Sequence, residues 1–287
     1  MISIIIPTKN EEKLLPRLLE CISNQTFKDY EIIVADANSD DNTVKIAESY
    51  GCKVVEGGMP GPGRNRGVKA AQGDYFMFFD ADVKFNKDFV AQAFEDFQRK
   101  YLDVASCFIY PDDESDKDYK VMFDFYNGYV SSAQYFNPGA LGSFIMSTRR
   151  IYERIGGFDE RIKLGEDYDY IKRASKLSKF RILKNVNVQI STRRIDKEGV
   201  LKYLTRNFSS EIYRFFVGEI TEDIFDYEFA NYDDIKKKKK KHKEIKHNKK
   251  LKALAQKIKI AIEKDKQKKE TRKIKKRNRK VWFYFIL

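Results

Sequence analysis

Short apolar runs alternate with amphipathic stretches along the first hundred residues of the chain. The runs Ile2–Ile6 and Tyr75–Phe79 are apolar except for Ser3, and their length is typical of strands buried on both faces. Between them, residues 11–25 carry leucines at helical spacing on one face, with Pro16 near enough to the start to be tolerated. This alternation predicts an α/β domain with a mostly parallel central sheet flanked by helices.

Further elements follow at short intervals. Residues 57–63 are predicted as a loop because of their glycines and prolines. An amphipathic helix is predicted at 197–219, where it would pack on the domain or shape its entrance. The other strands are predicted at 31–35, 53–56, 104–110 and 144–147, and the other helices at 43–50, 64–71, 86–100, 119–135 and from Glu166 onwards.

Charge is distributed unevenly along the 287 residues. The formal charge of the whole chain is +13, but residues 236–280 alone hold 24 Lys and Arg against 4 acidic residues. The rest of the chain therefore carries a net charge of −7. We predict a globular domain at 1–205, a helical extension at 206–235 that packs on it, and a lysine-rich tail at 236–287.

The globular part contains no histidine, since His242 and His247 both lie in the tail. This excludes Ser-His-Asp, Cys-His and histidine–metal chemistry there. Cys21, Cys52 and Cys107 match no zinc spacing, and their odd number fits no disulfide framework. With no signal peptide and no apolar run long enough to span a bilayer, we expect a cytoplasmic protein.

Polar residues follow three of the predicted strands at their carboxyl ends. In open α/β sheets, ligands bind in the crevice beyond these ends, so we expect one shared site. Taken alone, Asp36 is explained equally well as a helix cap. The residues concerned are Pro7, Thr8 and Glu11 after the first strand, Asp36 after the second, and Asp80 and Asp82 after the fourth.

Asp80 and Asp82 are two residues apart at the end of an extended segment, so their side chains point the same way. Paired carboxylates without histidine or cysteine suit a hard cation such as Mg²⁺ or Mn²⁺, whose shell is completed by water and substrate phosphate. The alternative is a capped turn that leads into the next helix.

Two further segments are candidates for chemistry. The glycine-rich loop leads into Arg64 and Arg66, and a helix start with free N–H groups would suit a phosphate, although a plain surface loop is the alternative. Glu166 and Asp167 open a helix. Acids there complement the helix dipole, but a carboxylate facing a cleft could equally act as a general base.

Six stretches together resemble the inverting family 2 glycosyltransferases of the GT-A fold, in the order and spacing of that family across residues 1–205. The family usually has a second acid where this chain has Ala37. The stretches are 4–12, 32–43, Gly63-Arg64-Asn65-Arg66-Gly67, Phe79-Asp80-Ala81-Asp82, Gly156-Gly157-Phe158-Asp159-Glu160 and Glu166-Asp167.

The resemblance implies a metal-dependent transfer of a sugar from a nucleotide-diphosphate sugar to a glycan or lipid-linked acceptor. It implies that Asp167 is the general base, with Glu166 beside it and Arg173 holding the pair. Ser143 and Phe144 would face the acceptor or the donor sugar. The nucleotide would contact Pro7, Thr8, Glu11, Asp36, Arg64 and Asp80, while Asp82 together with Asp80 would bind Mg²⁺ or Mn²⁺.

Two other functions fit parts of the chain. The segment 78–83 also resembles the nucleophile motif of haloacid-dehalogenase-type phosphatases, with Asp80 as nucleophile, but that motif normally ends the first strand of its domain. A polyanion-binding protein would act through the basic tail. The tail lacks interleaved aromatic residues for base stacking, so we expect no specific nucleic-acid partner.

The tail has a helical pattern of its own. Between Leu251 and Ile262, apolar residues recur at helical spacing with lysines on the other face, as in helices that bind membrane surfaces. We predict peripheral attachment to the anionic cytoplasmic face of a membrane, close to the acceptor. The alternative is a solvated lysine tract.

Overall fold

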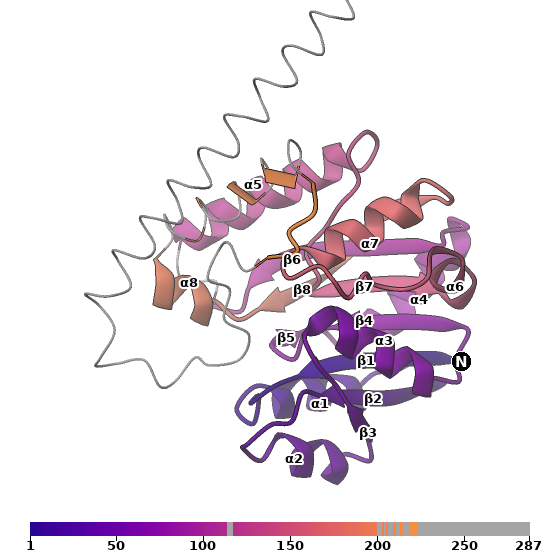
Figure 1. The fold of residues 1–287 in the computed structure, drawn as a ribbon, viewed down its shortest axis with the longest axis vertical. Coiled ribbons are helices and arrows are strands. Elements are labelled where there is room, and N and C mark those ends of the chain that lie inside the picture. The colour runs from indigo at the N-terminus through magenta and orange to yellow at the C-terminus, as the bar shows by residue number, and fades with distance from the viewer. Residues whose placement is uncertain are drawn as a thin grey trace, which may run out of the picture. The chain divides into compact units, whose positions relative to one another are not determined.

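A computed structural model describes residues 1–113 and 117–199 and, beyond these, residues 203, 205, 209–210, 213–214 and 218–222. Met1–Gly199 belong to one compact unit, and the described residues from Tyr203 to Glu222 belong to a second. Figure 1 shows the first unit as a sheet with helices on both of its faces. All residues of the candidate site lie in this unit.

The sheet has eight strands in the order β3-β2-β1-β4-β7-β6-β8-β5. β1, β2, β3 and β4 run parallel to one another, and β6 is parallel to β8. Only β7 and the short β5 run antiparallel to their neighbours, which confirms the mostly parallel sheet. The strands are β1 (Ile2–Thr8), β2 (Tyr30–Asp36), β3 (Lys53–Glu56), β4 (Tyr75–Phe79), β5 (Val83–Lys84), β6 (Val104–Pro111), β7 (Phe144–Thr148) and β8 (Phe180–Ile190).

The helices of this unit cover the sheet with their apolar faces. In the first of them, Pro16 stands in the first turn, where its missing N–H costs no hydrogen bond, and four apolar residues are buried. The helices are α1 (Leu15–Ser23), α2 (Thr43–Ser49), α3 (Pro60–Ala70), α4 (Phe89–Arg99), α5 (Lys117–Ala133), α6 (Arg149–Ile155), α7 (Glu166–Ser175) and α8 (Arg193–Glu198).

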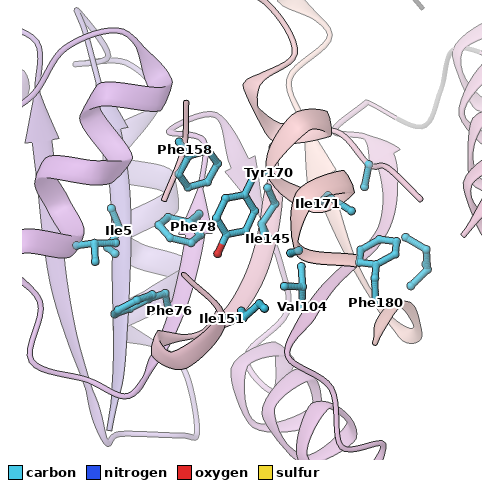
Figure 2. Packing of buried hydrophobic residues seen from close by; sticks show 14 of the residues in the cluster. Ile5, Phe76, Phe78, Val104, Ile145, Ile151, Phe158, Tyr170, Ile171 and Phe180 are labelled. Carbon is cyan, nitrogen blue, oxygen red and sulfur yellow. The ribbon is translucent and has the colours of Figure 1, made fainter. Parts of the chain in front are cut away.

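An aromatic core fixes α7 against the middle of the sheet. The rings of Phe158 and Tyr170 are stacked with centroids 4.2 Å apart, and Phe78 of β4 meets Phe158 edge to face at 5.1 Å. Figure 2 shows these rings together, with the Tyr170 hydroxyl at the buried end. That hydroxyl lies 2.6 Å from the hydroxyl of Ser147 in β7, so its polar atom is satisfied. The first turn of α7 is thereby held over the carboxyl end of β4.

The helix predicted at 64–71 begins earlier, at Pro60, and the predicted loop is correspondingly shorter. The glycines of this segment allow close packing inside the helix instead of forming a loop. A Cβ on Gly67 would lie 2.4 Å from Cγ2 of Ile5, and one on Gly63 would lie 3.1 Å from Cβ of Pro7. The helix therefore packs closely against β1, which no larger residue would permit.

Of the predictions for the C-terminal part of the chain, one can be compared with the structure and the others cannot. The helix predicted at 197–219 does not start at Lys197: α8 ends at Glu198, and Gly199 follows with a φ of +82°. Much of that segment and the whole tail at 236–287 lie outside the described residues, so the domain boundaries and the amphipathic tail helix stay predictions. No helix in the described part of the chain is long and apolar enough to cross a bilayer.

Candidate active site

The ends of β1 and β2 meet in a network around Asp36. Thr8 and Asp36 are register partners, and the Thr8 hydroxyl donates to Oδ1 of Asp36 at 2.9 Å. The backbone N–H of Ser39 donates to the other carboxylate oxygen at 2.7 Å. Both predicted residues are buried, together with Pro7. The Asp36 carboxylate is therefore fixed by the turn that follows it and does not cap a helix.

Arg193, which the sequence did not single out, links two predicted site residues. Its Nη2 lies 2.6 Å from Oε1 of Glu11 and 3.7 Å from Oδ2 of Asp82. The other carboxylate oxygen of Glu11 is buried and has no hydrogen-bond partner among the described residues. Such an atom is costly unless a ligand satisfies it. β8 and the start of α8 thus complete a site that begins at β1.

The carboxylates here carry more negative charge than Arg193 offsets. Burial raises the pKa of Glu11. Burial and the neighbouring charge of Asp80 raise the pKa of Asp82 to about 7, although Arg193 acts in the opposite direction. The described residues contain no cluster of three or more possible metal-ligating residues. Two carboxylates with uncompensated charge still fit a divalent cation that takes its other ligands from water and phosphate.

Arg64 joins the two predicted groups of acids. Its Nη1 lies 2.7 Å from Oε1 of Glu166 and its Nη2 lies 2.8 Å from Oδ1 of Asp80, while the guanidinium stands over the ring of Phe158. The side chain is fully buried. Burial lowers the pKa of Arg64, but the carboxylates of Asp80, Glu166 and Asp167 raise it by more than burial lowers it. The net pKa is raised, so Arg64 stays charged. The structure places Arg64 between the acids, within the site.

Asp167 lies buried in the first turn of α7, beside the loop that precedes β7. The N–H of Tyr168 donates to its Oδ1 at 2.8 Å. A Cβ on Gly142 would lie 3.1 Å from Oδ2 of Asp167 and 2.8 Å from Nη2 of Arg64, so this position accepts only glycine without rearrangement. The loop, Asp167 and the Arg64–Asp80 pair consequently share one small space.

The predicted role of Arg173 is wrong. Instead of holding Glu166 and Asp167, it donates to Oδ2 of Asp169 at 2.7 Å. It also donates to the carbonyl oxygens of Ile155 and Gly157, at 2.8 Å each. Since Asp169 and Arg173 are one turn apart, they tie α7 to the end of α6. This makes Asp169 a structural acid and separates it from its neighbour Asp167.

Asn65 is a second residue that the sequence did not single out. Its side-chain amide donates to the carbonyl oxygen of Phe158 and to Oε1 of Glu160, and it accepts from the N–H of Phe158 and the hydroxyl of Tyr152. A buried amide that makes four hydrogen bonds fixes its surroundings firmly. α3 is thereby joined to the segment that leads into α7.

The start of α3 is a weaker anion site than predicted. Pro60 and Pro62 have no N–H, and the N–H of Gly63 donates to the carbonyl oxygen of Met59. Within the first turn this leaves the N–H of Gly61. Arg66, which follows the predicted phosphate loop, donates to the carbonyl oxygen of Gly57 and lies 3.4 Å from Glu56.

Comparison with known proteins assigns a family to this arrangement. Residues 3–156, slightly more than half of the chain, match the family model described as glycosyl transferase family 2. This range contains the strand-end acids and Arg64, and it ends before Glu166 and Asp167.

Relatives of known name have similar segments. The poly(ribitol-phosphate) beta-N-acetylglucosaminyltransferase TarS of Staphylococcus aureus is 33% identical over 112 residues, which are 36% of this chain and 20% of TarS. The amylovoran biosynthesis glycosyltransferase AmsB of Erwinia amylovora is 30% identical over 196 residues, 61% of this chain and 64% of AmsB. The chondroitin synthase of Escherichia coli is 26% identical over 226 residues, 73% of this chain and 33% of the synthase. The chain thus spans about a fifth of TarS and less than two thirds of the others.

Solved structures share the fold. The mannosyltransferase PcManGT from Pyrobaculum calidifontis, in complex with GDP-Man and Mn²⁺, superposes with a TM-score of 0.62 at 20% identity, covering 74% of this chain and 63% of that one. S. aureus TarS 1–349 in complex with UDP-GlcNAc superposes with a TM-score of 0.56 at 22% identity, covering 89% and 80%. These similarities confirm the GT-A fold.

Proposed function

Because the chain belongs to glycosyl transferase family 2, we propose that it transfers a sugar from a nucleotide-diphosphate sugar to an acceptor hydroxyl or phosphate, with inversion. The observation that carries this proposal is the bridge through Arg64. It brings Asp80, at the end of β4, and Glu166, beside the candidate base Asp167, to the same cation. An inverting transfer needs donor-binding acids and a base within one site.

The ends of β1 and β2 would bind the nucleoside. Asp36 is held rigid by Thr8 and Ser39, as a residue that orients a ligand must be. The unpartnered oxygen of Glu11 can accept a hydrogen bond from the donor. Arg193 stands between Glu11 and Asp82, where its charge would favour an approaching diphosphate.

Asp82 and Asp80 would hold a Mg²⁺ or Mn²⁺ ion. When bound, such an ion neutralises the charge that develops on the departing nucleoside diphosphate. The raised pKa of Asp82 supports this assignment, because burial and the charge of Asp80 disfavour its ionised form until a cation binds. The complex of PcManGT with GDP-Man and Mn²⁺ supports it by analogy of fold.

Asp167 would act as the general base. The carboxylate of its neighbour Glu166 is engaged by Arg64 at 2.7 Å, so Asp167 is the candidate base of the pair. Asp167 lies beside the loop that contains Gly142, next to the Arg64–Asp80 pair. It would take the proton of the acceptor hydroxyl as the new glycosidic bond forms on the face opposite the leaving group.

Donor binding tests the proposal directly. The full chain is heated with UDP- and GDP-sugars in turn, each with and without Mn²⁺, because a ligand that binds the native state raises the melting temperature. We expect one nucleotide class to stabilise the protein in the presence of the metal. The same donor should then be consumed when candidate acceptors are added. Failure of every nucleotide sugar to shift the melting temperature would contradict the proposal.

The acceptor would be a glycan or a lipid-linked chain at a membrane surface. In support, relatives are named for poly(ribitol-phosphate), chondroitin and amylovoran. The lysine-rich tail at 236–287 would hold the enzyme on an anionic leaflet. Flotation with anionic liposomes tests this, and equal flotation of the full chain and of residues 1–235 would contradict it.

The two alternative functions lack comparable support. In a phosphatase, the nucleophilic carboxylate of Asp80 would have to attack a phosphate, yet one of its oxygens is engaged by Arg64 at 2.8 Å. The family model and the relatives reported above are those of glycosyltransferases. The polyanion-binding hypothesis depends on the tail, which lies outside the described residues.

A further inference from the structure

A basic hollow of about 390 Å³ lies at the opposite end of the sheet from the candidate active site. The active-site acids follow the carboxyl ends of strands, whereas this hollow uses Lys179–Asn185, at the amino end of β8. β6 and β8 are parallel and pair there through Val104–Cys107, at the start of β6. The ends of α4 and α5 form the rest of the wall. The hollow is therefore separate from the donor site.

The hollow is strongly cationic in a unit that is nearly neutral. Residues 1–199 contain 29 Lys and Arg against 31 Asp and Glu. Five of these cations and a single carboxylate line the hollow. A concave surface lined by one sign of charge concentrates ions of the opposite sign. The charged residues of the lining are Asp96, Arg99, Lys100, Lys179, Arg181 and Lys184.

The one carboxylate is already used. Asp96 is buried and accepts hydrogen bonds from Arg99 and Lys100. Burial raises the pKa of Asp96, but these two hydrogen bonds lower it by more than burial raises it. The carboxylate therefore stays charged and offsets the positive charge of Arg99 and Lys100. Lys179 donates to the carbonyl oxygen of Lys100 at 3.2 Å, which complements the C-terminal end of α4. These contacts do not account for the positive charges of Arg181 and Lys184.

Arg181 is held in place, while most of its N–H donors make no hydrogen bond within the part of the chain that the structure describes. Its Nη1 donates to the carbonyl oxygen of Phe180 at 2.6 Å, and its guanidinium lies 4.9 Å from the ring centroid of Tyr135. These contacts fix the plane of the group and use one of its five N–H donors. A planar, oriented guanidinium is well suited to a tetrahedral oxyanion.

A break in the strand pairing brings Lys184 to the hollow. Leu183 pairs with Cys107 and Asn187 with Phe108, so the residues at 184–186 have no partners on β6. Lys184 and Asn185 are exposed there, and within the described residues the ammonium group of Lys184 makes no hydrogen bond or ion pair. Such irregularities redirect side chains and are common beside binding sites. A regular ladder would have continued the pairing through Lys184.

We propose that this hollow binds a phosphate group, with Arg181 and Lys184 as its principal donors and Lys179 and Asn185 at its rim. The volume exceeds that of a single phosphate, so a diphosphate or a phosphodiester with its neighbouring groups also fits. The phosphate belongs either to a small anion or to a chain that carries phosphodiesters. This site does not depend on the proposed transferase function.

Lysine reactivity in the full chain tests the proposal residue by residue. Lysines are acetylated briefly without ligand, with pyrophosphate, or with an oligo(glycerol phosphate), at constant ionic strength, and the modification of each is read by mass spectrometry. We expect both phosphate compounds to slow the modification of Lys184 about threefold or more, since a bound oxyanion engages its ammonium group. Exposed Lys45 and Lys87 serve as controls, and the tail is identical in all samples.

The variant Arg181→Gln completes the test. It should abolish the protection of Lys184, whereas Lys87→Gln, an equal change of charge elsewhere, should preserve it. Stronger protection by the oligomer at equal phosphate concentration assigns the site to a chain, and equal protection assigns it to a free anion. Equal slowing at Lys45 and Lys184, or protection that survives Arg181→Gln, would overturn the proposal. An unchanged melting temperature shows that the variant is folded.

Discussion

Nη1 of Arg64 lies 2.7 Å from Oε1 of Glu166, although the two residues are 102 positions apart in the sequence. The same guanidinium binds Asp80, so removing it leaves two acids without their cation. We expect Arg64→Met to lower the free energy of unfolding by ~3–5 kcal/mol, because a buried charge that loses its partner is strongly destabilising. Urea denaturation followed by circular dichroism measures this loss.

Arg66→Met is the matched control, since Arg66 belongs to the same helix but is exposed, beside Glu56 at the end of β3. Its loss should cost less than ~1 kcal/mol, as for other exposed ion pairs. Equal losses for the two variants would mean that the bridge through Arg64 contributes nothing beyond an ordinary surface contact.

Asp167 and Asp169 should separate into a chemical and a structural acid. We expect Asp167→Asn to retain donor binding and to reduce the rate of transfer by about 10²–10⁴-fold, the usual loss when a general base is removed. Asp169→Asn breaks the contact with Arg173 and should mainly lower the free energy of unfolding, by ~1–3 kcal/mol. Donor titrations, single-turnover rates and denaturation of both variants distinguish these effects.

The assignment of the base fails if the two variants lose transfer activity equally. It also fails if Asp167→Asn transfers at the rate of the unmodified enzyme.

The stability of the enzyme should depend on Asp82 in a defined pH range. The pKa of this carboxyl is raised from 3.8 to about 7 in the folded chain, so the folded state holds the proton more tightly than the unfolded state. Stability from this group is present at low pH and is lost as the pH rises through ~4 to ~7. Asp82→Asn cannot ionise, so it should be more stable than the unmodified enzyme at pH ~8, by at least ~1.4 kcal/mol.

Melting temperatures measured without divalent cations from pH ~5 to pH ~8 test this. The advantage of Asp82→Asn should grow across that range. Added Mn²⁺ should reduce the advantage, because a bound cation stabilises the ionised carboxylate of the unmodified enzyme. An advantage that is constant with pH would mean that Asp82 does not titrate in this range.

Arg193 should compete with a divalent cation for the carboxylates around it. It lies 2.6 Å from Glu11 and 3.7 Å from Asp82, so Arg193→Gln removes positive charge from the site. Without donor, we expect Mn²⁺ to bind this variant more tightly, on the order of tenfold. Electron paramagnetic resonance of free Mn²⁺ measures this affinity, with Arg154→Gln on the surface of α6 as control. Unchanged or weaker binding would contradict the role given to Arg193.

The strands that could be predicted are those whose own residues determine their conformation. β4 is fully apolar and is followed by two acids, so both its position and its place beside the candidate site could be predicted. β8 was not predicted, because its alternation is interrupted at Lys184 and Asn185, where the ladder itself shifts. β5 is only two residues long, and it owes its conformation to pairing with β8.

The glycines and prolines near α3 also show that local sequence alone is not sufficient to predict an element. They predict a loop at 57–63, yet the helix begins at Pro60, because close contact with β1 makes glycine necessary inside it. The acids of the site could be predicted one by one from their places after strands. Their links through Arg64, Asn65 and Arg193 could not, since each joins segments that are distant in sequence.

The pairing of β5 with β8 imposes an order on the folding of the chain during its synthesis. Val83 pairs with Ile190, and the N–H of Ser191 donates to the carbonyl oxygen of Asp82 at 3.2 Å. The surroundings of Asp82 can therefore form only after about 110 further residues, up to Arg193, have left the ribosome. A nascent chain that already displays its strand-end acids still lacks the segment that completes their site.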